Sequence, residues 1–220
     1  MFNWFSHKKH PEFWQEYMTA IKSAKPEELA DTRFVVFDTE TTGIQPETDR
    51  ILSIGAISVT GNVIHVSDVF ERFIIQEKFN ANTVEIHGIL KNGEQLKITE
   101  SEAIELFLSY LSSSIIVAHH AAFDVEMINR CLKRMKLPKL KNKVLDTGIL
   151  YKKLNNVPNK HYGLDFLCTE FNVPANDRHN ALGDAYITAQ VFVKMIARMK
   201  QERKVTLADL FVNRQGVGLL

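Results

Sequence analysis

Residues 34–43 read FVVFDTETTG, and this stretch sets the expected fold. Its four leading residues are aromatic or β-branched, so they predict a buried strand, which ends in a turn at Gly43. Because side chains alternate across a strand, Asp38 and Glu40 project to the same face. Neighbouring carboxylates repel each other, and a divalent metal between them removes that repulsion. On this stretch alone, two unrelated acids at a solvated strand end are an equal alternative.

Two later segments carry further acids and histidines. Residues 118–124 read AHHAAFD and follow the apolar run at residues 115–117, and residues 179–185 read HNALGDA. In this order, the three segments resemble the exonuclease motifs of the DEDD-type 3′–5′ exonucleases, the family that includes the proofreading epsilon subunit of bacterial DNA polymerase III. The resemblance runs from Phe34 to about Met199.

The order of the predicted elements indicates an α/β fold. Apolar, β-branched runs and a tight turn at Gly61 and Asn62 predict three consecutive antiparallel strands between residues 34 and 75. Helical patterns then alternate with short runs at residues 115–118 and 144–147, which predict buried parallel strands. Such alternation is typical of layered α/β domains. The resemblance implies a ribonuclease-H-like mixed five-stranded sheet flanked by helices.

Three regions are expected along the chain. Residues 1–32 form a helical N-terminal appendage, whose apolar stripe we expect to pack on the rest of the protein. Residues 33–201 form the exonuclease domain, and residues 202–220 form a short helix and a C-terminal tail. The stripe consists of Phe13, Trp14, Tyr17, Met18 and Ile21.

Composition excludes several classes of protein. Hydrophobic residues make up 45% and charged residues 24% of the 220 residues, as in soluble globular proteins. The net charge of +1 means that any nucleic-acid contact comes from a local patch. Cys131 and Cys168 lie in apolar helical contexts and predict reduced residues of a cytoplasmic protein. No segment has transmembrane length or a secretory signal pattern, so we expect no membrane partner.

Four acids are the candidate catalytic and metal-binding residues: Asp38, Glu40, Asp124 and Asp184. If they converge, their oxygen ligands suit Mg²⁺ or Mn²⁺ better than zinc, and they can hold two ions about 4 Å apart. Such a pair assists in-line attack of water on a phosphodiester. The resemblance implies that Asp38 bridges the two ions. It also implies that Glu40 and Asp184 support the ion beside the water, whereas Asp124 supports the other.

His179 is the candidate general base. It precedes Asp184 by five positions, at the start of a predicted helix, where its imidazole can take a proton from the attacking water. The family has a histidine subtype and a tyrosine subtype, and Asn180 occupies the position of the tyrosine, so the histidine subtype fits. The alternative is that His179 is a loop residue and Asn180 a helix cap. We interpret Asp146, which ends a predicted strand, as a helix cap or an acid that supports the site.

Substrate contacts are expected from the turn after the first strand. The resemblance implies that Thr41 and Ile44 meet the terminal nucleotide, and His119 is expected to contact the substrate as well. His120 stands where the family often has asparagine. A run of basic residues would help to bind single-stranded nucleic acid. The alternative is that these residues only complement a helix dipole and are solvated. The run consists of Lys133, Arg134, Lys136, Lys139, Lys141 and Lys143.

The predicted function is a metal-dependent 3′–5′ exonuclease that releases nucleoside 5′-monophosphates from single-stranded DNA, in proofreading or repair. One alternative is the same reaction on RNA. Another is a non-catalytic nucleic-acid-binding or polymerase-tethering module, which would lack one of the acids or the histidine. A polymerase subunit is an expected partner. Residues Leu207 to Phe211 resemble peptides that dock on sliding clamps, although they lack the leading glutamine and also fit an ordinary capped helix.

Overall fold

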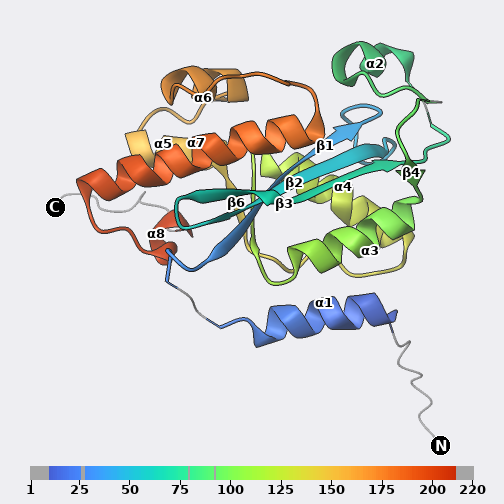
Figure 1. Cartoon of the computed structure of the whole chain (residues 1–220), viewed down its shortest axis with the longest axis horizontal. Coiled ribbons are helices and arrows are strands. Elements are labelled where there is room, and N and C mark those ends of the chain that lie inside the picture. Colours follow the sequence, from blue (N-terminus) through green and yellow to red (C-terminus); the bar gives the residue numbers. More distant parts are fainter. Residues whose placement is uncertain (1–9, 26–27, 79, 92, 212–220) are drawn as a thin grey trace, which may run out of the picture.

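A six-stranded mixed sheet forms the centre of the molecule (Figure 1). The computed structural model describes residues 10–25, 28–78, 80–91 and 93–211. The strands are β1 (Arg33–Thr41), β2 (Ile51–Thr60), β3 (Val63–Ile74), β4 (Lys97–Ile98), β5 (Ile115–Ala118) and β6 (Val144–Asp146), in the spatial order β4-β3-β2-β1-β5-β6. β1, β2 and β3 are antiparallel neighbours, whereas β5 and β6 run parallel to β1. The predicted α/β class is confirmed.

The prediction of five strands is wrong by one strand. The additional strand, β4, consists of two residues that pair in parallel with the end of β3. A segment of this length is too short to show the alternation of apolar and polar residues that identifies a strand. The three antiparallel strands and the two short parallel strands occur where the sequence predicts them.

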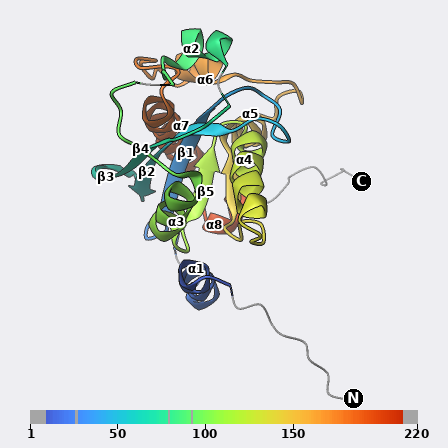
Figure 2. The same cartoon turned by 90° about the vertical axis from the view of Figure 1, so that its right-hand side faces the viewer.

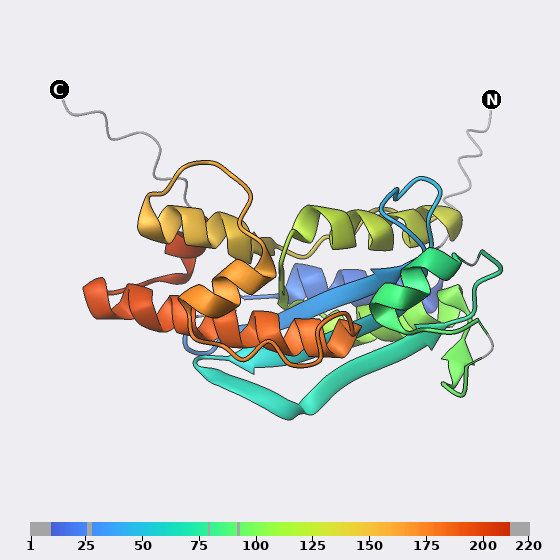
Figure 3. The ribbon, with the colours of Figure 1, turned by 90° about the horizontal axis from the view of Figure 1, so that it is seen from above.

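Helices cover both faces of the sheet. They are α1 (Glu12–Ser23), α2 (Ala81–His87), α3 (Glu100–Leu111), α4 (Ala121–Arg134), α5 (Thr147–Asn155), α6 (Leu164–Glu170), α7 (Ala181–Glu202) and α8 (Leu207–Phe211). Figure 1 shows α6 and α7 above the sheet and α3 and α1 below it. Figure 3, seen from above, shows α7 running along β1 and β2, with which it is in contact.

β1 is buried on both faces, and its alternate residues supply two separate cores. Phe34 and Val36 pack with α5, α6 and α7, whereas Val35 and Phe37 pack with α1, α3 and α4. A strand that is apolar on both sides is expected at the centre of a sheet covered by helices on each face. The continuous apolar run before Asp38 therefore places the acids at the end of the central strand.

The N-terminal helix α1 packs on the rest of the protein, as the apolar stripe predicts (Figure 2). Trp14 and Tyr17 are buried against the sheet side that carries α3. The Tyr17 hydroxyl donates to the Asn142 side chain at 2.6 Å and accepts from the Lys141 amide at 2.8 Å. These bonds fix α1 to the segment that precedes β6.

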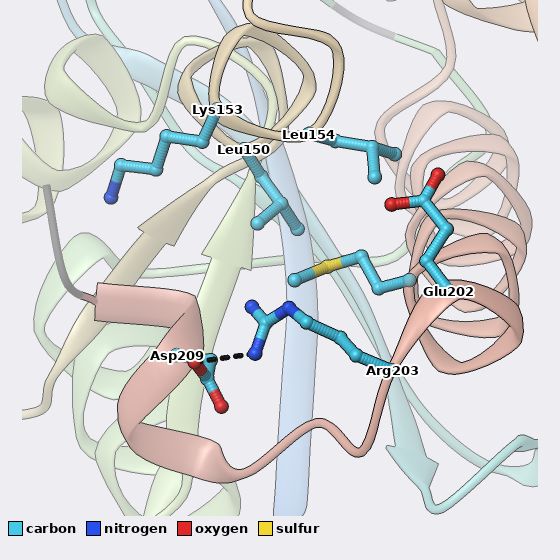
Figure 4. A pocket seen from close by; sticks show the side chains of 7 residues that line it. Leu150, Lys153, Leu154, Glu202, Arg203 and Asp209 are labelled. Carbon is cyan, nitrogen blue, oxygen red and sulfur yellow. Dashed lines mark hydrogen bonds and ion pairs between the residues drawn. The ribbon is translucent and has the colours of Figure 1, made fainter. Parts of the chain in front are cut away.

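The C-terminal helix α8 is anchored beneath the end of α7 (Figure 4). Arg203 pairs with Asp209 at 2.7 Å, and Asp209 also accepts from the amide and hydroxyl of Thr206. Leu210 is buried in the core. Leu210 belongs to the segment Leu207 to Phe211, which resembles a clamp-docking peptide. Because it is buried, it cannot contact a clamp unless α8 leaves its position.

Asp146 is a helix cap, one of the two roles that the sequence allows, and it joins two helices. One carboxylate oxygen accepts from the Ile149 amide of α5 at 2.9 Å, and the other accepts from the Ala121 amide of α4 at 2.8 Å. α5 itself was not predicted, because its residues Thr147 to Asn155 carry a weak apolar pattern. Cys131 and Cys168 are buried free thiols. Among the helices that the structure describes, none is both long and apolar enough to cross a membrane.

Candidate active site

Three predicted acids meet at the end of the central strand. Asp38 and Glu40 lie on one face of β1, because Thr39 between them points to the other face. Carboxylate oxygens of Asp38, Glu40 and Asp184 all lie within 4.8 Å of one another. We call these residues the carboxylate trio. Segments that are far apart in the sequence thus bring three carboxyl groups to one point.

A glycine in β2 positions the third acid. Gly55 pairs with Asp38 across the antiparallel ladder, so both lie on the same face of the sheet. A Cβ atom at Gly55 would lie 2.1 Å from the Leu182 nitrogen and 2.3 Å from the Ala181 carbonyl carbon. Only a residue without a side chain lets the first turn of α7 come this close. That turn carries Asp184.

The cap of α7 is Asn180, whose side-chain oxygen accepts from the Gly183 amide at 3.0 Å. The sequence analysis gave this capping role of Asn180 only as the alternative interpretation. Asp184 lies in the first turn of the helix, where the helix dipole stabilises a carboxylate. Its Oδ2 accepts from the backbone amide of His179 at 3.1 Å. The loop before α7 thereby holds the acid in position.

Asp124 reaches the same place from the opposite face of the sheet. It lies in the first turn of α4, and its Oδ1 accepts from the Thr39 amide at 3.1 Å and the Thr39 hydroxyl at 2.6 Å. It is not one of the trio, but it lies close enough to Asp38 that its charge raises the pKa of Asp38. The fourth predicted acid therefore adjoins the trio while it is hydrogen-bonded to the strand.

The pKa values of these acids record both burial and repulsion. Burial first, and the charge of Asp124 second, raise the pKa of Asp38 well above its usual value. Burial and the charge of Asp184 raise the pKa of Glu40 to about 7. The pKa of Asp124 is also raised to about 7, because burial outweighs its bonds to Thr39. Without a cation, these carboxylates retain protons near neutral pH.

The donor set fits a hard divalent ion. All of the trio's ligand atoms are carboxylate oxygens, and hard oxygen donors favour Mg²⁺ and Mn²⁺ over zinc. A divalent ion would also remove the repulsion that raises the pKa values of Asp38 and Glu40. In the described part of the chain, the trio is the one group of three such side chains close enough to share an ion.

Arg178 is a charged neighbour that the sequence analysis missed. Its guanidinium bonds Oδ1 of Asp184 and, at 2.8 Å, Oδ1 of Asp165 on α6. It supplies positive charge to the trio, since it lowers the pKa values of both Asp38 and Glu40 against the larger effects of burial and repulsion. A signal was present, because a basic residue directly precedes the candidate base His179.

His179 lies in the loop before α7, and its backbone amide is bonded to Asp184. Its side chain is exposed, and its backbone adopts the left-handed region with φ of 64°. It borders a groove of about 760 Å³ between α2, β3 and the start of α7. Exposed apolar side chains line much of this groove, among them Val66, Ile86 and Tyr186. His179 is therefore accessible both to solvent and to a molecule lying in the groove.

The predicted substrate contacts occupy different surroundings. The Thr41 hydroxyl donates to the Gly43 carbonyl at 2.7 Å and holds the turn after β1. Ile44 follows this turn and is 86% exposed, so it is free to contact a ligand. His119 is half-buried, and its Nδ1 lies 2.9 Å from the Thr147 hydroxyl.

The basic run is only partly available to a nucleic acid. Arg134 makes two bonds of 2.7 Å to the Glu100 carboxylate, so its charge is neutralised within the protein. Lys139 lies 3.7 Å from Glu126. Lys133 and Lys136 are exposed. The interpretation of these residues as a strand-binding patch therefore depends on the lysines and not on Arg134.

Comparison with known proteins identifies relatives for most of the chain. Residues 35–192 match the RNase T family of exonucleases. The chain is 33% identical over 182 residues to the PolC-type DNA polymerase III of Thermotoga maritima, and 33% identical over 181 residues to that of Staphylococcus aureus. These matches cover 83% and 80% of this chain, respectively. The chain spans only 13% and 12% of the length of those polymerases.

Solved structures share the fold at lower sequence identity. The nuclease domain of 3′hExo, a DEDDh family member bound to rAMP, superposes with a TM-score of 0.68 at 14% identity, covering 78% of this chain and 94% of that one. E. coli exonuclease I in complex with a dA16 oligonucleotide superposes with a TM-score of 0.68 at 16% identity. The match covers 78% of this chain and 42% of that one. Exonuclease X in complex with 5′-overhanging duplex DNA superposes with a TM-score of 0.58 at 23% identity. The match covers 76% of this chain and 91% of that one.

Proposed function

This chain belongs to the DEDD family of 3′–5′ exonucleases, and we propose that it removes nucleoside 5′-monophosphates from the 3′ ends of single-stranded DNA. The observation that carries the proposal is the convergence of Asp38, Glu40 and Asp184 within 4.8 Å. All three residues lie inside the region that matches the family. A non-catalytic module would have no reason to keep three mutually repelling carboxylates together, of which Asp184 is buried and the other two are half-buried.

We infer that the site takes two Mg²⁺ or Mn²⁺ ions. Asp38, Glu40 and Asp184 would hold one, and Asp38 with Asp124 would hold the other. When bound, the ions polarise the phosphodiester and neutralise the charge that develops on the departing 3′ oxygen. The raised pKa values of Glu40 and Asp124 support this assignment, because a cation would let both acids ionise at neutral pH.

The chain's own residues supply the proton transfer and the positioning. His179 would take the proton of the attacking water, since its side chain is exposed and its backbone amide is bonded to Asp184 of the trio. Thr41 and Ile44 would meet the terminal nucleotide at the turn after β1. Arg178 would leave Asp184 when cations enter and would then be free to meet a phosphate oxygen.

DNA is the proposed substrate because the relatives that share 33% identity are DNA polymerases. For the same reason, we propose that the chain acts together with a replication or repair polymerase. RNA is the alternative substrate, since structures with this fold include one bound to rAMP and one that recognises a histone mRNA stem-loop. Docking on a sliding clamp through Leu207 to Phe211 would require Leu210 to leave the core. Absence of clamp pull-down by the intact chain would exclude that partner.

A nuclease assay with end-blocked oligonucleotides tests the proposal. Single-stranded DNA and RNA of one sequence, each blocked at the 3′ or the 5′ end, are incubated with Mg²⁺ and with EDTA. We expect mononucleotide release from 5′-blocked DNA, none from 3′-blocked DNA, and none in EDTA. Faster release from RNA would reassign the substrate. Absence of release from every oligonucleotide, or release that persists in EDTA, would refute the proposed function.

A further inference from the structure

Three histidines form a cluster at the end of β5. His119 and His120 follow the strand directly, and His161 comes from the loop between α5 and α6. The rings of His120 and His161 are stacked, with centroids 4.3 Å apart and planes 5° apart. The ring of His119 meets His120 edge-on, with centroids 4.3 Å apart.

The requirements of the fold do not account for this cluster. Nε2 of His119 and Nε2 of His120 are buried without a hydrogen-bond partner in the described part of the chain. Leaving a buried polar atom unpaired costs about 1–3 kcal/mol. His120 occupies the N-cap position of α4 with φ of 58°, which is uncommon for a residue other than glycine, and its side chain makes no capping bond to the described helix.

The cluster is not arranged to bind a metal. An ion lies in the plane of each imidazole that ligates it, and two nearly parallel stacked rings have no such common point. Among the described residues, the three histidines do not form a group whose ligand atoms are all close enough to share an ion, whereas the carboxylate trio does. The cluster therefore presents ring faces and not convergent lone pairs.

The cluster borders the carboxylate site. Asp146, whose charge acts on His119, also bonds the Ala121 amide at the start of α4, the helix that carries Asp124. Arg178, the partner of Asp184, is close enough to His119 to influence its pKa as well. The stacked rings thus lie on the side of the proposed catalytic site where the loop between α5 and α6 runs.

The half-buried rings are uncharged at neutral pH. Burial first, and the neighbouring His120 second, lower the pKa of His119 to about 4. Burial and His161 also lower the pKa of His120. The stacked rings of His120 and His161 offer a flat aromatic face to a planar ligand. The second ring, His161, is exposed, so it can receive a flat ligand from solvent.

We propose that His120 and His161 form a stacking platform for a base of the substrate strand, upstream of the nucleotide that is cleaved. This inference rests on the proposed function, because it names a subsite of the same active site. Aromatic rings that stack on bases are a general way to hold single strands, and each contributes about 1–3 kcal/mol per base. His161 receives the base, and His120 supports His161 from below. Both residues are positioning residues and do not take part in bond cleavage.

Binding of fluorescent oligonucleotides tests the platform independently of hydrolysis. We would measure the dissociation constant of 5′-labelled single-stranded DNA by anisotropy, with Ca²⁺ in place of Mg²⁺. His161→Ala should weaken binding about 5- to 100-fold, the equivalent of one lost stack. His161→Phe should restore binding to within about threefold, because it keeps an aromatic ring. His10→Ala is the control, since His10 is an exposed histidine that also contacts an aromatic ring, at the far end of α1.

An abasic scan identifies the base that is bound. Oligonucleotides that lack one base, at each of the last four positions, are bound to the wild type and to His161→Ala. One abasic position should weaken binding by the wild type and have no further effect on the variant, because base and ring act as a pair. Unchanged affinity of His161→Ala, or abasic effects that are equal in both proteins at every position, would refute the platform. Absence of hydrolysis in Mg²⁺ with normal binding would instead refute the proposed function.

Discussion

The backbone nitrogen of Leu182 lies so close to Gly55 that a Cβ atom on Gly55 would be only 2.1 Å from it. This contact places the first turn of α7 on the strand that pairs with Asp38, and so brings Asp184 to Asp38 and Glu40. The geometry of the carboxylate trio therefore depends on Gly55, because any side chain at this position of β2 would push the first turn of α7 away.

Replacing Gly55 with alanine should displace α7 and weaken cation binding. We expect Gly55→Ala to lower the affinity for Mn²⁺ at least tenfold, measured by isothermal titration calorimetry, and to lower the free energy of unfolding by about 1–3 kcal/mol through overpacking. Ala56→Gly is the matched control, because Ala56 is the next residue of β2 and is fully buried on the other face. It should cost some stability but leave the affinity for Mn²⁺ unchanged. Equal cation affinity in Gly55→Ala and the wild type would contradict this role of Gly55.

The stability of the metal-free protein should fall as pH rises. Glu40 and Asp124 have pKa values raised from 4.5 and 3.8 to about 7. Between the usual pKa values of these acids and pH 7, the folded state binds more protons than the unfolded state. The free energy of unfolding therefore decreases as the pH rises through this range. We expect a loss of about 2 kcal/mol or more between pH 5 and pH 8, measured by urea denaturation in EDTA.

Two further measurements check the origin of this pH dependence. Mg²⁺ should restore stability at pH 8, because it stabilises the ionised carboxylates. Glu40→Gln should flatten the pH dependence, since it removes one of the titrating groups. A metal-free wild type whose stability is constant or increases between pH 5 and pH 8 would show that these acids are not kept protonated by burial and repulsion.

Removing the charge of Arg178 should strengthen cation binding. The guanidinium bonds Asp184 and partly neutralises the trio, so it competes with an incoming ion. We expect Arg178→Gln to bind Mn²⁺ several-fold more tightly and to be less stable than the wild type in EDTA. Arg198→Gln is a suitable control, because Arg198 forms an ion pair of 2.9 Å with Glu170, away from the trio. Weaker Mn²⁺ binding by Arg178→Gln would mean that Arg178 organises the ligands and does not compete with the ion.

Loss of the His179 imidazole should slow catalysis without affecting cation binding. We expect His179→Ala to lower kcat about 10²- to 10⁴-fold, as is typical when a general base is removed. Its affinity for Mn²⁺ should remain that of the wild type, because His179 contacts Asp184 through its backbone amide, which alanine retains. Steady-state kinetics on single-stranded DNA and calorimetry give the two values. A kcat within threefold of the wild type would remove the assigned role.

The sequence predicts the parts of this site that depend on local periodicity. Alternation along β1 puts Asp38 and Glu40 on one face, and the apolar residues at steps of three and four predict the helix α7 that carries Asp184. Contacts between distant segments could not be predicted in the same way. The bonds of Arg178 to Asp184 and Asp165, and of Asp124 to Thr39, depend on how loops and helices approach each other in the folded chain. The glycine at position 55, inside a strand of larger residues, was a signal of close backbone approach.

The most direct test of the account is the rate at which Asp184→Asn releases 3′-terminal nucleotides from 5′-labelled single-stranded DNA in Mg²⁺. Asp177→Asn serves as the control, because Asp177 is an exposed acid in the same loop with φ of 59°, a backbone conformation that asparagine tolerates. We predict that Asp184→Asn remains folded and loses at least 10³-fold in rate, about 4 kcal/mol of transition-state stabilisation, while Asp177→Asn keeps the wild-type rate. A folded Asp184→Asn that hydrolyses DNA at the wild-type rate would contradict the central claim that the carboxylate trio is the catalytic site.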